Sequence, residues 1–109
     1  MCVQGVYIGG IRNRVTDFGK KHSHYGGPLD RDSLVAALQQ KDAELHQVLD
    51  EIGPAGEAEY TIEFYGKQSL AQFLSTILHH EAIHHGQWSF YAALAGFETP
   101  QSWQLNWGL

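Results

Sequence analysis

The stretch His79-His80-Glu81-Ala82-Ile83-His84-His85-Gly86-Gln87-Trp88 decides the fold, because it places four of the seven histidines within seven positions of one helical segment. His80 and His84 are four residues apart, so on an α-helix they lie one above the other on the same face, about 6 Å apart along the axis. Two neutral imidazoles placed in this way can bind one metal ion. The spacing therefore predicts a metal-binding pair on one face of a helix.

The histidine pair lies on the apolar stripe of this helix. At 100° per residue, the pair shares one stripe with five large apolar residues: Leu70, Phe73, Ile77, Trp88 and Tyr91. Ser69 is a suitable N-cap and Gly96 is a natural C-terminal stop, so we expect a helix of roughly 27 residues. His79 and His85 point away from the stripe, whereas we expect His80 and His84 to face the core.

The chain before this helix is also mainly helical in pattern. Residues 1–15 carry apolar side chains every four positions and predict a helix, which looks like the tail of a longer one because no capping residue precedes it. Residues 17–28 are a polar loop by composition. Asp30 and Asp32 are candidate N-caps of a second helix, which we expect to end at Gly53-Pro54.

Two segments depart from the helical pattern. Residues 60–66 alternate with a period of two and predict an extended segment, which we expect to lie across the helices because it is too short and solitary to build a sheet. The C-terminal tail is rich in large apolar residues: Pro100, Trp103, Leu105 and Trp107. We expect this tail to fold back over apolar surface.

Length and composition indicate one globular domain over residues 1–109. Seven Lys and Arg against twelve Asp and Glu give a net charge of -5, which disfavours binding to nucleic acid or to anionic lipid. The lone Cys2 cannot form an internal disulfide, and no run of 18 apolar residues or signal-peptide pattern occurs. These features favour a cytoplasmic protein that does not associate with membranes.

The histidine stretch also contains the motif H-E-x-x-H, in which Glu81 would be the general base of a zinc protease. That interpretation needs a further ligand downstream and a substrate cleft, and Glu98 is the only later acidic residue. A plain carboxylate on the flank of the helix is the simpler interpretation of Glu81. Cys2 as a nucleophile is weaker still, because no adjacent base is evident.

A catalytic zinc site usually has three protein ligands, so His80 and His84 need a third. Candidates within the chain are His46, on the flank of the second predicted helix, and His22 or His24 in the polar loop. Each of these three is also well explained as an ordinary solvated histidine. A ligand from another subunit, or water, is the remaining alternative.

The pattern His80-x-x-x-His84-His85-Gly86-Gln87 is followed by a Gly and a Pro after the helix, at Gly96 and Pro100. It resembles the end of the last bundle helix in the DinB-like superfamily, with His85 where arginine is common. The resemblance implies an all-α, up-down helical bundle with a long histidine-bearing last helix. It further implies a zinc or nickel ion bound by three histidines, with His80 and His84 as two of the ligands.

Against that family pattern the chain looks shortened at its N-terminus, with three helices in place of four. Family members donate the third histidine from the second bundle helix, which here corresponds to residues 1–15, and no histidine precedes His22. The uncovered apolar stripes around Leu38 and Ile77 lead us to expect a homodimer.

The activity implied by the resemblance is that of a metal-dependent thiol transferase or hydrolase, using a metal-activated water or thiolate and a small-molecule thiol as partner. Glu81 or His85 would then move protons. The alternative is a catalytically inert bundle that serves as an interaction or structural module. Loss of the third ligand favours this alternative.

Overall fold

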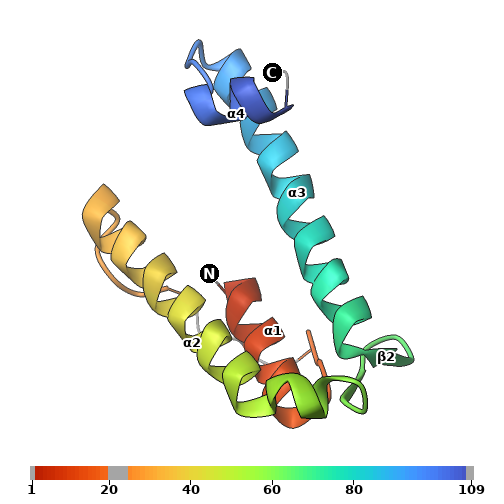
Figure 1. Cartoon of the computed structure of the whole chain (residues 1–109). Helices are drawn as coiled ribbons and strands as arrows, with labels where there is room; N and C mark the ends of the chain where they lie inside the picture. Colours follow the sequence, from red (N-terminus) through yellow and green to blue (C-terminus); the bar gives the residue numbers. More distant parts are fainter. Residues whose placement is uncertain (1, 20–24, 108–109) are drawn as a thin grey trace. The chain divides into compact units, whose positions relative to one another are not determined.

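The computed structural model describes residues 2–19 and 25–107 of the chain. These ranges contain four helices and two short strands: α1 (Cys2–Asn13), α2 (Arg31–Glu57), β1 (Thr61–Glu63), β2 (Lys67–Ser69), α3 (Leu70–Leu94) and α4 (Gln101–Trp107) (Figure 1). The chain divides into two compact units, Met1–Leu74 and Ser75–Leu109, with the helix α3 contributing to both. The expectation of a mainly helical protein is confirmed, with a small sheet in addition.

The first unit is built around a core in which apolar side chains from α1, α2, β1 and the start of α3 are buried: Tyr7, Ile8, Ile11, Val48, Ile62, Leu70 and Phe73. The ring of Phe73 meets the rings of Tyr7 and Phe64 edge-on, with centroids 5.7 Å apart in both pairs. Gly10 allows this close packing, because a Cβ there would lie 2.2 Å from Thr16 Oγ1. The helix predicted over residues 1–15 is therefore confirmed as α1.

Helix α2 begins as predicted at the N-cap Asp30, whose carboxylate accepts hydrogen bonds from the backbone N–H and the hydroxyl of Ser33. These two hydrogen bonds hold the pKa of Asp30 below its usual value. The predicted end at Gly53-Pro54 is only partly right. Gly53 has a φ of 65° and kinks the helix, but Pro54 opens a further turn that runs to Glu57.

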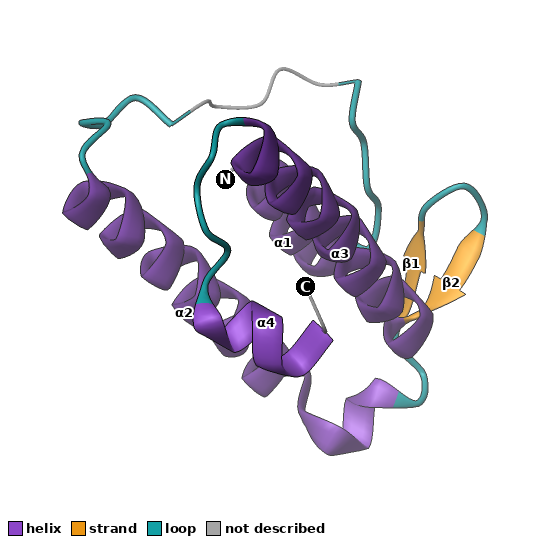
Figure 2. Ribbon diagram, turned by 90° about the horizontal axis from the view of Figure 1, so that it is seen from above, coloured by secondary structure: helices purple, strands orange, loops and turns teal. Residues whose placement is uncertain are grey.

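The expectation that residues 60–66 are too solitary to form a sheet is wrong. Strand β1 pairs antiparallel with β2, which follows it directly (Figure 2). The chain reverses at Tyr65 and Gly66, which both have positive φ values of 49° and 111°, as tight hairpin turns require. The other edge of β1 also pairs, because Thr16 donates its backbone N–H to the carbonyl oxygen of Glu63 at 2.9 Å.

Helix α3 has the predicted caps at both ends. Ser69 and Gln72 form a capping box, in which the Ser69 hydroxyl accepts from the Gln72 N–H at 3.2 Å and the Gln72 side chain accepts from the Ser69 N–H at 2.9 Å. Gly96 has a φ of 74° directly after the helix, and the N–H of Phe97 donates back to the carbonyl oxygen of Ala92. The helix has 25 residues, close to the predicted length.

The second unit contains the rest of α3 and the short helix α4. The Trp103 ring of α4 lies against the His85 ring, with centroids 5.2 Å apart, which confirms in part that the tail folds back. Leu105 is 77% exposed, so the tail does not cover all of its own apolar surface. No helix in the described ranges is long and apolar enough to cross a membrane.

The predicted core stripe of α3 is buried only at its N-terminal end. Leu70 and Phe73 are buried, whereas Trp88 is 68% exposed and Tyr91 is 64% exposed. The apolar stripe of α3 is therefore covered at its start and exposed beyond its middle, in line with the uncovered surface expected around Ile77. The second unit is too small to bury these rings by itself, because its only other described helix has seven residues.

Candidate metal centre

The two histidines that the sequence singled out converge in the structure. The Nε2 atoms of His80 and His84 are 2.8 Å apart, and the ring centroids are 4.6 Å apart. Both side chains are half-buried on α3. One helical turn between the residues, with both side chains on the same face, brings the ring nitrogens together. The pair therefore presents two imidazole nitrogens at a single point.

Gln87 fixes the orientation of His84. The Nδ1 atom of His84 lies 3.0 Å from the Oε1 atom of Gln87, three residues further along α3. A carbonyl oxygen only accepts, so Nδ1 carries the proton in this hydrogen bond. In the neutral ring, the lone pair is then on Nε2, the atom that faces His80. A histidine that ligates a metal through one nitrogen commonly donates its other N–H to an oxygen in this way.

The two nitrogens fit a shared metal ion. Two ligands at zinc–nitrogen distances of about 2.0–2.1 Å in a tetrahedral arrangement lie about 3.3 Å apart. The observed separation of 2.8 Å is that of a direct N–H···N hydrogen bond, with His80 as the donor. Small side-chain rotations that lengthen the distance between the two Nε2 atoms by roughly half an ångström would give the separation of two zinc ligands. Two donors of the right kind, with one orienting partner, are thus in place.

The described residues contain no group of three or more His, Cys, Asp and Glu side chains suited to a metal ion. Of the candidate third ligands, His22 and His24 lie outside the described residues. His46 is exposed on α2 in the first unit. Among the described residues, His80 and His84 are therefore the two candidate ligands that the structure brings together.

The neighbouring polar residues take other roles or none. Glu81 is half-buried, and within the described residues its carboxylate makes no hydrogen bond or ion pair. His85 is occupied by the Trp103 ring and so joins α3 to α4. His79 is exposed, as its position off the apolar stripe predicts. The side chain of Cys2 lies outside the described residues.

Sequence reasoning missed the role of Gln87. The residue was noted only as part of the Gly86-Gln87 continuation of the motif, yet it supplies the oxygen that orients His84. The signal was available in the spacing, because residues three apart on a helix are neighbours. A Gln three residues after a candidate ligand histidine is thus a detectable orienting partner.

Searches of curated proteins and of solved structures each gave no match to this chain. The family profile of the DinB superfamily matches residues 1–88, a span that includes His80, His84 and Gln87. The match covers most of the 109 residues and both the packed first unit and the histidine-bearing part of α3. The chain therefore belongs to the DinB superfamily.

Proposed function

We propose that the protein binds a divalent metal ion, zinc or nickel, through the Nε2 atoms of His80 and His84. The observation that carries this proposal is the convergence of the two atoms to 2.8 Å, combined with the 3.0 Å hydrogen bond from His84 Nδ1 to Gln87. Metal binding would replace the direct hydrogen bond between the two rings, and both Nε2 atoms already point toward the position of the ion. Membership of the DinB superfamily supports the same assignment.

The reaction we propose is a metal-dependent transfer of a small-molecule thiol or a hydrolysis. A bound divalent ion lowers the pKa of a water or thiol, which makes either a nucleophile near neutral pH. His80 and His84 would hold the ion, and Gln87 would hold the tautomer of His84. Glu81 has no partner of its own among the described residues and is the side chain available to accept a proton beside the pair.

The third ligand is proposed to come from His22 or His24, or from a second copy of the chain. A second copy has a surface to bind, since large apolar side chains of the second unit are exposed: Leu78, Ile83, Trp88, Phe90, Tyr91, Leu94, Phe97 and Leu105. Monomeric proteins rarely leave so much apolar surface in contact with water. We therefore propose a homodimer that completes an up-down bundle.

A catalytically inert interaction module is the second candidate function. The same exposed rings of Trp88 and Tyr91 favour it, because a surface of this kind is also what a protein-binding module presents. In that case the His80–His84 contact would be an ordinary hydrogen bond between two side chains.

Metal content and affinity distinguish the two functions. Protein purified without chelators is analysed for bound metal, and zinc and nickel affinities are measured by competition with a chromophoric chelator. We expect bound metal in the wild type, its loss in His80→Ala and in His84→Ala, and full retention in His79→Ala, which removes an exposed histidine from the same helix. A folded wild type that takes up neither ion would refute metal binding and leave the inert module.

A further inference from the structure

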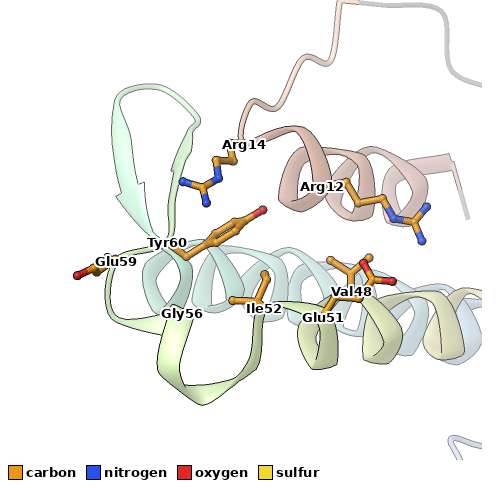
Figure 3. A pocket seen from close by; sticks show the side chains of 8 residues that line it. All are labelled: Arg12, Arg14, Val48, Glu51, Ile52, Gly56, Glu59 and Tyr60. Atoms are coloured by element: carbon orange, nitrogen blue, oxygen red, sulfur yellow. The ribbon is translucent and has the colours of Figure 1, made fainter.

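A second candidate site lies in the first unit, away from the histidine pair in sequence. A cavity of about 470 Å³ opens between the end of α1, the second half of α2 and Tyr60 (Figure 3). Its volume is within the range of about 300–1,000 Å³ that is usual for small-molecule sites. No histidine lines it, and its lining residues all belong to the first unit.

Two apolar residues of α2 form the floor of the cavity. Val48 is only 2% exposed, and Ile52 is half-buried beside it on α2. The ring of Tyr60 forms an adjoining wall, and its hydroxyl donates to the carbonyl oxygen of Ile11 at the end of α1. The Tyr60 hydroxyl is thus already used, so the tyrosine offers a bound molecule mainly the face of its ring.

Arg14 places a positive charge over this wall. The guanidinium carbon lies 4.2 Å from the centroid of the Tyr60 ring, a cation–π contact that restricts where the group can move. Figure 3 shows the Arg14 side chain extending above the Tyr60 ring, while Glu59 points away from it on the other side. Within the described residues, Arg14 forms no ion pair with a carboxylate. Its hydrogen-bond donors therefore stay available to an anion.

The backbone at Arg14 is held in an unfavourable conformation. Its φ is 59°, a backbone angle that residues other than glycine and asparagine rarely adopt. The conformation is fixed by neighbours, because the N–H of Glu63 donates to the Arg14 carbonyl oxygen at 2.9 Å. Strain of this kind persists where the surrounding structure imposes it, and it concentrates at binding sites. This pairing fixes the point from which the Arg14 side chain leaves the backbone toward Tyr60.

The far end of the cavity has a different charge pattern. Arg12 and Glu51 both line this end, but they do not form an ion pair with each other. The Glu51 carboxylate instead accepts a hydrogen bond from the side-chain amide of Gln47 at 2.9 Å. The two arginines and the two carboxylates that line the cavity nearly balance, so a molecule with one negative group, placed at Arg14 away from Glu51, suits it better than a dianion.

We propose that this cavity binds a small organic carboxylate. The carboxylate pairs with the Arg14 guanidinium, whose planar donors match its two oxygens, and the apolar body lies over Val48 and Ile52 against the Tyr60 ring. The proposal is independent of the metal centre, because it uses residues of the first unit alone.

The test is a titration of the full-length protein with 3-phenylpropionate, followed by amide chemical shifts in ¹H–¹⁵N spectra. We expect saturable shifts at Ile52, Gly56 and Tyr60, with a dissociation constant in the millimolar range. The neutral analogue 3-phenylpropanol and inorganic phosphate should each bind at least roughly tenfold more weakly, since one lacks the charge and the other lacks the apolar body.

Arg14→Gly removes the guanidinium but keeps a residue that favours positive φ, so its fold should be retained. Arg14→Asn serves as a second variant for the same reason. Both should weaken 3-phenylpropionate binding roughly tenfold or more. The matched control Arg31→Gln alters an exposed arginine paired only with its neighbour Asp32, and it should bind as the wild type does. Absence of saturable shifts in the wild type, unchanged binding in folded Arg14 variants, or equal binding of phosphate or of the alcohol would overturn the proposal.

Discussion

The two compact units of this chain differ in how they treat their apolar side chains. All seven buried large apolar side chains of the described ranges belong to the first unit, where aromatic rings pack edge to face around Phe73. Among the described residues of the second unit, none reaches the same burial. Yet the second unit carries the histidine pair, which lies within the span matched by the family profile.

The features that stabilise the fold and the candidate functional features lie in different units. The first unit has a core of its own, two capped helix starts and a strand whose edges are both paired. The second unit has a helix with two converging imidazole nitrogens and a surface of exposed rings. We infer that the free energy of unfolding depends mainly on the first unit. The function of the second unit depends on the metal ion and the second copy that we propose it binds.

The largest difference in the free energy of unfolding should appear between alanine variants of two phenylalanines, one in each unit. Phe73 is fully buried, and Phe73→Ala should lower the free energy of unfolding by about 3–5 kcal/mol, because it leaves a cavity among packed rings. Phe90 is 62% exposed on the same helix, and at protein concentrations low enough for the monomer, Phe90→Ala should change stability by no more than about 0.5 kcal/mol. Urea unfolding followed by circular dichroism gives both values. Equal losses would mean that the two units share one core.

The orienting role of Gln87 should appear in metal affinity and not in folding. Gln87→Ala removes the acceptor of the His84 Nδ1–H, and it should weaken zinc binding about 10- to 100-fold. Gln101→Ala, an exposed glutamine at the start of α4, is the matched control and should bind as the wild type does. Competition with a chromophoric chelator measures both affinities. An unchanged affinity in Gln87→Ala would remove Gln87 from the site.

Self-association should depend on the exposed rings of the second unit and not on those of the first. Tyr91→Ser should weaken the proposed homodimer about tenfold, because aromatic side chains are common anchors of interfaces. Tyr65→Ser changes a 94% exposed tyrosine at the hairpin turn and should leave association unchanged. Sedimentation velocity over a concentration series measures both. A well-folded wild-type monomer at micromolar concentration would contradict the dimer.

The smallest effect should come from the N-cap of α2 in the first unit. Because hydrogen bonds from Ser33 lower the pKa of Asp30 in the folded state, its carboxylate stabilises the fold above the unfolded pKa of about 4. That contribution is lost as pH falls through the lowered folded pKa. Asp30→Ala should therefore unfold at a slightly lower urea concentration than wild type at pH 7, and the difference should shrink below about pH 4. A difference that grows on acidification would contradict the assignment.

The sequence was sufficient for features that depend on local chemistry. The caps at Asp30 and Ser69, the stop at Gly96 and the convergence of His80 with His84 all follow from residue types at fixed spacings. The resemblance to the family rests on a motif of the same local kind, which runs from His80 to Pro100.

Features that depend on non-local pairing were not predictable in this way. The partner of β1 is a strand of only three polar residues, Lys67–Ser69, which carries no alternating pattern of its own. The sequence predicts uncovered apolar surface around Ile77, and Trp88 and Tyr91 on the same stripe are indeed exposed. Helical periodicity identifies an apolar stripe, but it does not say what covers that stripe.

The most direct test of the central claim follows the imidazole nitrogens of the histidines during a zinc titration, using long-range ¹H–¹⁵N spectra of the full chain. We predict that the Nε2 signals of His80 and His84 move to the metal-bound range together, that Nδ1 of His84 stays protonated toward Gln87, and that His79 does not respond. Zinc that leaves the Nε2 signals of both His80 and His84 unchanged would contradict the account.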